Sequence, residues 1–275
     1  MSNEVYDSQT RSRIIVDTFK AFWVYRELVW VLVKRDISVR YKRSFLGLLW
    51  TLLNPLFTAV ILWFVFIEIF SARLPNQTQF APYVLSGVLI VTFFTQGFSQ
   101  AADSIAQGSS ILTKIFVPPQ VFAFAGAISN AANFIFGLIA LSFITILTGD
   151  GISSLFFLVI IVIISMLMLV TGLGLIISIV YIRFEDMRSI VAILISFMMY
   201  LSPIFYPKEI LSGTVLRIVN MNPLTSYLDV FRHVFSNTGV ASWGDWLYVG
   251  TFSVVILLLG IRVFEKAWPR TVVMM

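Results

Sequence analysis

The first group of residues whose types and spacing could do chemistry is a basic segment ahead of a long apolar run. It carries five basic side chains, at Lys34, Arg35, Arg40, Lys42 and Arg43. Guanidinium groups form paired hydrogen bonds with phosphate oxygens, and basic clusters beside a membrane attract anionic headgroups. The segment therefore suggests a site for an anionic lipid headgroup or a pyrophosphate. The alternative is that these charges only fix the orientation of a membrane protein.

A second candidate is a short amphipathic segment further along the chain, between two apolar runs. It combines four apolar side chains with one lysine, at Ile111, Leu112, Lys114, Ile115 and Phe116. Apolar side chains that nothing in the chain obviously covers suggest a surface for a partner protein. The alternative is a helix that lies back on the bilayer.

Several kinds of chemistry are excluded by what the sequence lacks. It has no cysteine and a single histidine, His233, so thiol nucleophiles, disulfides and multi-histidine metal sites are ruled out. No G-x-x-x-x-G-K-[ST] loop is present, so the chain should not bind ATP phosphates in the usual way. Charges within 183–188 are most simply read as a local salt-bridge cluster. We therefore predict no catalytic residue, no metal site and no cofactor bound by this chain.

Composition predicts the environment of these residues. Of the 275 residues 59% are hydrophobic and only 12% are charged, whereas a soluble domain carries about a quarter charged residues. The mean hydropathy is +0.92, and the net charge of +5 comes from basic residues in short stretches between apolar runs. That distribution is typical of membrane topology rather than of nucleic-acid binding. The sequence predicts an all-α polytopic membrane protein.

Dividing the chain at its charged residues gives six transmembrane helices, because a span needs about 20 apolar residues. The predicted spans are 45–67, 81–102, 120–147, 152–182, 189–206 and 246–261. The corresponding predicted parts are a cytoplasmic N-terminal segment 1–44, a six-span domain 45–264 and a cytoplasmic tail 265–275. Lysine and arginine are concentrated before the first span, in the even-numbered loops and after the last span, which places both termini in the cytoplasm.

Two apolar segments are too short or too charged to span. Residues 19–37 predict an N-terminal amphipathic helix in the plane of the interface. Residues 207–236, split near Asn222, predict an outer re-entrant helical pair between spans five and six. The chain shows no internal repeat, so a symmetric pathway would require a second copy of the chain.

Several motifs together resemble a known family. They are Arg35-Asp36, Arg40-Tyr41-Lys42, Ser44-x-x-Gly47, Trp50, Pro55, Asn222-Pro223-Leu224-Thr225 and Phe231-Arg232. The chain resembles the membrane subunit of ABC exporters for bacterial polysaccharides, such as O antigens, teichoic acids and some capsules. The resemblance runs from about Glu27 to the C-terminus.

The resemblance implies a homodimer in the bacterial inner membrane, with two separate ATPase subunits that bind ATP and Mg. It implies a polyprenyl-pyrophosphate-linked polysaccharide as substrate, contacts with membrane lipids, and no nucleic acid. The in-plane helix and the loop 111–116 would contact the ATPase. Residues 35–43 would lie where the substrate enters from the cytoplasm.

Spans one and five would line the pathway, where sugars could stack on aromatic rings. The candidate lining residues are Trp50, Phe57, Phe64, Phe197, Tyr200, Phe205 and Tyr206. The alternative for each ring is a place in the aromatic belt of the interface. An exporter of the same architecture for a drug, haem or lipid remains the main alternative function, ahead of a membrane glycosyltransferase or a channel.

Overall fold

The computed structural model describes residues 14–41, 80–112, 114, 117–149, 151–184, 186–236 and 241–271, with isolated positions between 49 and 64. Most of the predicted first span therefore lies outside the described residues. Every regular element of the described part is a helix, and loops join these helices. Its helices are α1 (Ile14–Val24), α2 (Arg26–Tyr41), α4 (Phe80–Gln107), α5 (Ser109–Leu112), α6 (Gln120–Leu147), α7 (Val159–Arg183), α8 (Met187–Leu201), α9 (Gly213–Met221), α10 (Pro223–Ser236) and α11 (Trp243–Thr271), with 3-10 turns at Phe156–Leu158 and Lys208–Ile210.

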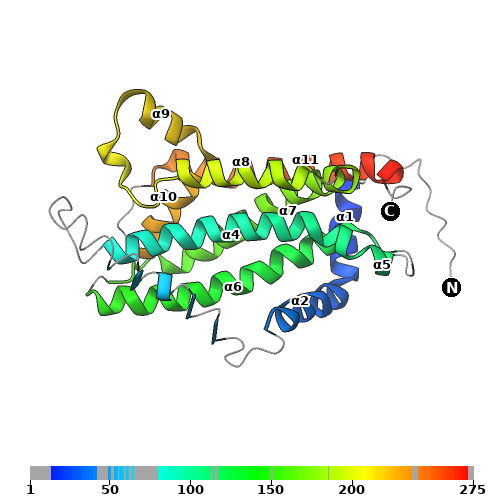
Figure 1. Cartoon of the computed structure of the whole chain (residues 1–275), viewed down its shortest axis with the longest axis horizontal. Coiled ribbons are helices and arrows are strands. Elements are labelled where there is room, and N and C mark those ends of the chain that lie inside the picture. Colours follow the sequence, from blue (N-terminus) through cyan, green and yellow to red (C-terminus); the bar gives the residue numbers. More distant parts are fainter. Residues whose placement is uncertain are drawn as a thin grey trace.

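The body of the protein is a bundle of long apolar helices. In the described part of the chain four helices are long and apolar enough to cross a membrane, at Pro82–Gln107, Gln120–Leu147, Phe156–Arg183 and Trp243–Thr271. They correspond to predicted spans two, three, four and six. Figure 1 shows α4, α6, α7 and α11 running side by side along the long axis. The chain is therefore a multi-pass helical membrane protein.

Helix boundaries follow local chemistry. The prediction for span three coincides with α6, which starts directly after Pro119. The prediction for span five, 189–206, is too long, because α8 ends at Leu201. Proline lacks an amide donor and disfavours helical geometry in the residue before it, so Pro203 stops the helix near Ser202. The last span is longer than predicted, since α11 continues to Thr271.

Close contacts between small residues hold the bundle together. A Cβ built at Gly260 of α11 would lie 2.3 Å from the carbonyl oxygen of Gly172 in α7. A Cβ at Gly172 would lie 2.5 Å from the carbonyl oxygen of Ile256, and one at Gly174 would lie 2.5 Å from the Cβ of Ala101 in α4. Such small residues let helix backbones approach closely in lipid, where dispersion contacts supply much of the attraction.

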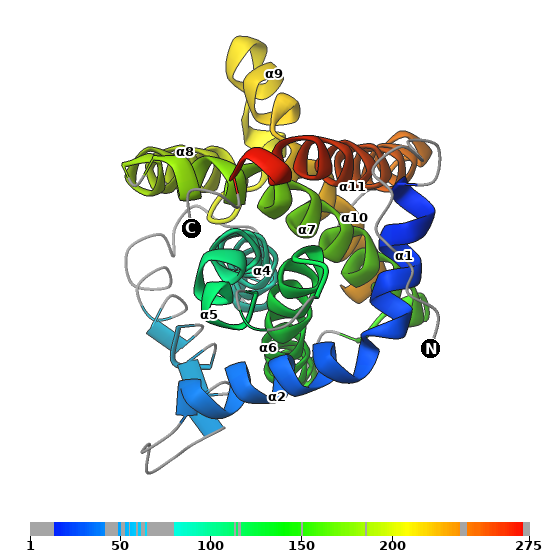
Figure 2. The same cartoon turned by 90° about the vertical axis from the view of Figure 1, so that its right-hand side faces the viewer.

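The N-terminal region is two helices rather than the single in-plane helix predicted from 19–37. Figure 2 shows α1 and α2 crossing the end of the bundle at an angle to each other. The turn between them is at Tyr25. The hydroxyl of Thr18 in α1 donates a 2.9 Å hydrogen bond to Glu265 near the end of α11. Trp23 and Trp30 are exposed, with Arg26 and Lys34 respectively over their rings.

At the opposite end of the bundle lies the pair α9 and α10, separated at Asn222. One face of α10 is an apolar stripe that is fully buried: Leu224, Tyr227, Leu228, Phe231, Val234 and Phe235 are each at most 1% exposed. By contrast α9 projects away from the bundle, as Figure 2 shows. Only Val219 of α9 is buried.

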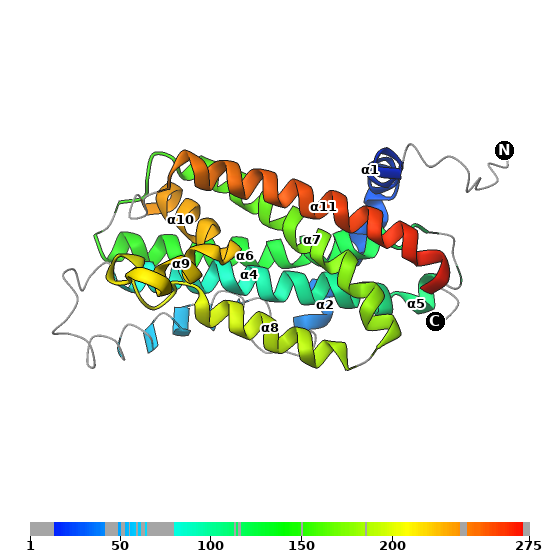
Figure 3. The same ribbon diagram turned by 90° about the horizontal axis from the view of Figure 1, so that it is seen from above.

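The helix α8 stands at the edge of the bundle (Figure 3). Among its 15 residues only Val191 is buried. An apolar helix with so little protein contact presents most of its surface to lipid or to another chain.

Candidate functional site

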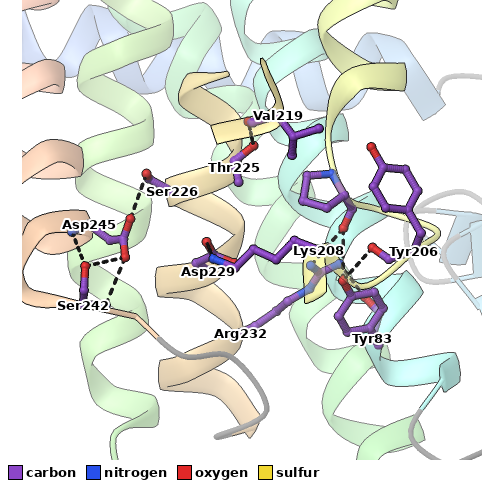
Figure 4. A network of polar contacts seen from close by, with 11 residues as sticks. Tyr83, Tyr206, Lys208, Val219, Thr225, Ser226, Asp229, Arg232, Ser242 and Asp245 are labelled. Carbon is purple, nitrogen blue, oxygen red and sulfur yellow. Dashed lines mark hydrogen bonds and ion pairs between the residues drawn. The ribbon is translucent and has the colours of Figure 1, made fainter. Parts of the chain in front are cut away.

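A buried arginine lies at the centre of a polar network between α4, α8 and α10. Arg232 is only 3% exposed. Its Nη1 donates to the carbonyl oxygen of Pro203 at 2.9 Å, and its Nη2 donates to that of Tyr83 at 3.2 Å. Its Nε donates to Ser86 Oγ at 3.2 Å, and its Cζ lies 3.6 Å from the centroid of the Tyr83 ring. Figure 4 shows how these groups converge.

A second cation and one carboxylate complete this group. Lys208 forms an ion pair with Asp229, which lies three residues before Arg232 in α10 (Figure 4). Burial raises the pKa of the Asp229 carboxyl, while the hydrogen bond and the charge of Lys208 act in the opposite direction. Two cations thus share one carboxylate in a largely buried setting. We call Tyr83, Ser86, Lys208, Asp229 and Arg232 the α10 network.

The same region is tied to the end of α8 by further hydrogen bonds. Tyr83 Oη donates to the carbonyl oxygens of Tyr206 at 3.0 Å and Pro203 at 3.3 Å. Asn222 Nδ2 donates to the carbonyl oxygen of Met198 and to Ser202 Oγ, both at 2.9 Å. These contacts satisfy carbonyl groups that the helix end leaves open, so the end of α8 is held firmly.

A polar contact at the start of α11 continues this region. Asp245 accepts hydrogen bonds from the backbone and side chain of Ser242 at 3.0 and 2.8 Å, and from Ser226 of α10 at 3.0 Å (Figure 4). The carboxylate thereby satisfies a free amide at the helix start and joins α10 to α11.

The predicted basic site is only partly covered by the described residues. Arg35 donates to Asp36 through Nη2 at 2.9 Å and Nε at 3.2 Å. The other oxygen of Asp36 lies 3.5 Å from Gln100 of α4 and Ser129 of α6. Arg35 is therefore oriented by a carboxylate that faces the bundle, while its own side chain is 43% exposed. The side chains of Arg40, Lys42 and Arg43 lie outside the described residues.

The predicted aromatic residues are at the protein surface where they are described. On α8 the exposed rings are Phe197 and Tyr200. Three further exposed rings belong to the predicted first span, at Trp50, Phe57 and Phe64. Phe205 and Tyr206, predicted at the end of span five, follow the end of α8 at Leu201.

The predicted partner surface is partly described too. Ile111 and Leu112 lie in α5 and are half-buried against the core, and Lys114 is exposed. A Cβ at Gly108, just before α5, would lie 2.5 Å from Phe122, so the loop is packed closely on α6. Ile115 and Phe116 lie outside the described residues.

Sequence reasoning did not identify the α10 network as buried. It named Arg232 as part of the Phe231-Arg232 motif and assigned no role to Lys208 or Asp229. A signal was present, because Arg232 falls between Leu228 and Phe235 within the apolar stripe of α10. A charge within an apolar helical face indicates a paired, buried group.

The long apolar bundle, with the helices α1 and α2 across one end and the pair α9 and α10 at the other, defines a multi-pass helical membrane protein. The chain belongs to the ABC-2 type transporter family, whose sequence model matches residues 27–236. Members of this family are permease subunits without catalytic activity of their own, and they work with separate ABC ATPase subunits.

Individual relatives are similar over almost their whole length. The chain is 25% identical to the O-antigen export system permease protein RfbA of Myxococcus xanthus, over 90% of this chain and 95% of that protein. It is 26% identical to the RfbA permease of Klebsiella pneumoniae, over 87% and 92% of the two chains. It is 23% identical to the capsule polysaccharide export inner-membrane protein CtrC of Neisseria meningitidis, over 88% and 92%.

Proposed function

We propose that the chain is the permease subunit of an ATP-driven exporter of polyprenyl-pyrophosphate-linked polysaccharide in the bacterial inner membrane. Two copies form the pathway, and each copy contacts one ATPase subunit on the cytoplasmic side. The observation that carries this proposal is the end-to-end similarity to O-antigen and capsule export permeases. The separation of the molecule into an end with α1, α2 and α5 and an end with α9 and α10 supports it.

In this proposal the three regions take different roles. The helix α5 and the crossing helices α1 and α2 contact the ATPase. Residues 35–43 bind the pyrophosphate where the substrate enters, and the exposed rings of α8 and the first span line the pathway. The pair α9 and α10 re-enters the membrane at the exit side, with the six spans between residues 45 and 264 placing both termini in the cytoplasm.

Copurification tests whether the chain is an ABC exporter permease, and polysaccharide export tests its substrate. The tagged chain, purified from its own host, should retain an ABC ATPase subunit on an affinity column, and deleting the chain should abolish surface polysaccharide. Failure to retain any nucleotide-binding subunit would overturn the proposal. Normal surface polysaccharide together with loss of a drug or lipid efflux activity would favour the alternative substrate class instead.

Introducing a negative charge on α5 should uncouple the transporter. Leu112→Glu places a carboxylate on the proposed contact surface, so we expect export to fall about ten-fold, the scale of a typical coupling free energy between sites. The measurement is surface polysaccharide together with ATP hydrolysis by the purified complex. Ile152→Glu, the same kind of change at an exposed position in the loop before α7, is the control and should export normally. Normal coupling in Leu112→Glu would remove α5 from the proposed ATPase interface.

Neutralising the basic segment should block export without inverting the membrane topology of the protein. The triple variant Arg35→Gln, Arg40→Gln, Arg43→Gln removes charge-assisted hydrogen bonds to a pyrophosphate, and we expect export to fall by about ten-fold or more. Topology is checked by labelling single cysteines introduced at Ser8 and Ser212 with an impermeant reagent in intact cells. Reaction at position 8 but not at position 212 would show that these charges only orient the chain.

A further inference from the structure

The polar contacts that attach the helix α8 to the bundle lie near its two ends, while Val191 and Ile195 between them pack on the core. Near Ser202 it is held by Asn222 and by the α10 network, all through buried or largely buried groups. Near Met187 the described contact is an ion pair between Arg188 and Asp103 of α4. Between these ends the exposed residues include Ile193, Leu194, Phe197 and Tyr200.

Among the described residues Arg188 pairs with Asp103 rather than with another charge of 183–188, while Glu185 of the predicted local cluster lies outside the described residues. Arg188 Nε lies 3.2 Å from Asp103 Oδ1, and the guanidinium carbon lies 5.6 Å from the ring centroid of Tyr181. The side chains of Arg188 and Asp103 are 46% and 31% exposed. Asp103 Oδ1 is itself buried and accepts no hydrogen bond from the described residues, so Arg188 supplies its compensating charge.

Neither charge stabilises the helix that carries it. Arg188 lies in the first turn of α8, where the helix dipole disfavours a cation. Asp103 lies near the C-terminal end of α4, where the same dipole disfavours an anion. Helix stability alone therefore does not explain these two residues. Their ion pair contributes instead to the contact between α4 and α8.

The position of Asp103 connects this contact to the ATPase-facing loop. Only four residues separate it from Gly108, and the Gly108 amide donates to the carbonyl oxygen of Ser104, so the backbone is continuous with α5. The end of α4 and α5 therefore form one continuous segment, and the ion pair joins that segment to the end of α8.

We propose that Asp103 and Arg188 are positioning residues that transmit movement of α5 to α8. This inference rests on the proposed function, because it takes α5 as the ATPase contact and α8 as a lining helix. The two attachments of α8 differ in kind: the buried contacts near Ser202 are costly to break, whereas a half-exposed ion pair exchanges readily with water. The helix therefore pivots near Ser202 and swings at Arg188.

The test is a charge-swap cycle in the complete complex with its cognate ATPase. Asp103→Asn and Arg188→Gln should each lower surface polysaccharide about ten-fold, while ATP hydrolysis by the complex in phosphatidylethanolamine–phosphatidylglycerol vesicles stays within about two-fold of the parent. The swap Asp103→Arg with Arg188→Asp should recover export to within about three-fold, since it restores the pair and also suits both helix dipoles. Arg183→Gln, at an exposed neighbouring position, should export normally.

The readouts separate this inference from the function on which it rests. Normal export by either single variant, no recovery in the swap, or an equal loss in Arg183→Gln would overturn the ion-pair role. A parallel fall in export and in the amount of membrane-inserted chain, measured by immunoblot, would also overturn it, because the pair would then only support folding. A parent chain that binds no ATPase would instead contradict the proposed function.

Discussion

Arg232→Met will destabilise the protein more than any other single charge removal in its described part. The variant removes the guanidinium donors of the Tyr83 and Pro203 carbonyl oxygens and of Ser86 Oγ. Each carbonyl keeps one further donor, Ser86 Oγ for Tyr83 and Tyr83 Oη for Pro203. Hydrogen bonds to a charged donor contribute about 1.5–3 kcal/mol each, so we expect a total loss of about 2–3 kcal/mol. The measurement is the thermal unfolding midpoint of detergent-purified protein, together with the fraction that remains monodisperse.

A matched control is available on the neighbouring helix. Arg217 of α9 is exposed, so Arg217→Met should leave the unfolding midpoint almost unchanged. Gly87→Ala gives an independent route to the same site, because the added methyl would lie 2.9 Å from Arg232 Nη2. Equal stability of Arg232→Met and Arg217→Met would show that the α10 network contributes little.

Gly260→Leu will separate α7 from α11. A Cβ at this position would already lie 2.3 Å from the carbonyl oxygen of Gly172, and the larger side chain has no room at the crossing. Overpacking of this kind typically costs about 1–3 kcal/mol and occasionally more, and we expect the upper part of that range because backbone atoms form the obstacle. The expected result is a lower yield of inserted, monodisperse protein and a lower unfolding midpoint.

The same helix supplies the control for this substitution. A Cβ at Gly250 of α11 would meet nothing within 4 Å, so Gly250→Leu changes the same residue type without a clash. If both variants unfold at the same temperature, the close crossing of α7 and α11 does not limit stability.

The long spans were predictable because lipid imposes a simple rule on composition. Apolar runs bounded by charges or prolines gave α6 to the residue and α4, α7 and α11 to within several residues, apart from the extended end of α11. The end of span five was misplaced because apolar residues continue past Pro203, and hydropathy alone ignores the effect of proline on the backbone. The break between the two N-terminal helices at Tyr25 could not be predicted, because no proline or glycine lies there.

The candidate site was less predictable, since its contacts join distant parts of the chain. Arg232 reaches Tyr83 across 149 residues, and a sequence records the charge but not its burial. Likewise other acidic residues lie closer to Arg188 in sequence than Asp103 does. The pairing of Arg188 with Asp103 follows from the packing of α4 beside α8, which the sequence does not show. Local motifs predicted the helix that carries Arg232, whereas only the fold shows which groups that side chain contacts.

The hydrogen bond from Thr18 to Glu265 has a consequence for the timing of biosynthesis. Its two residues are 247 positions apart, so α1 leaves the ribosome long before its acceptor in α11 has been made. Chains emerge from the N-terminus onward, so Phe22 of α1 can pack on Phe124 of α6 before α11 is made, whereas the contact with α11 must wait until the spans between are inserted. The docking of α1 on α11 is thus a late event in assembly, and it marks a chain whose last helix has been synthesised and placed.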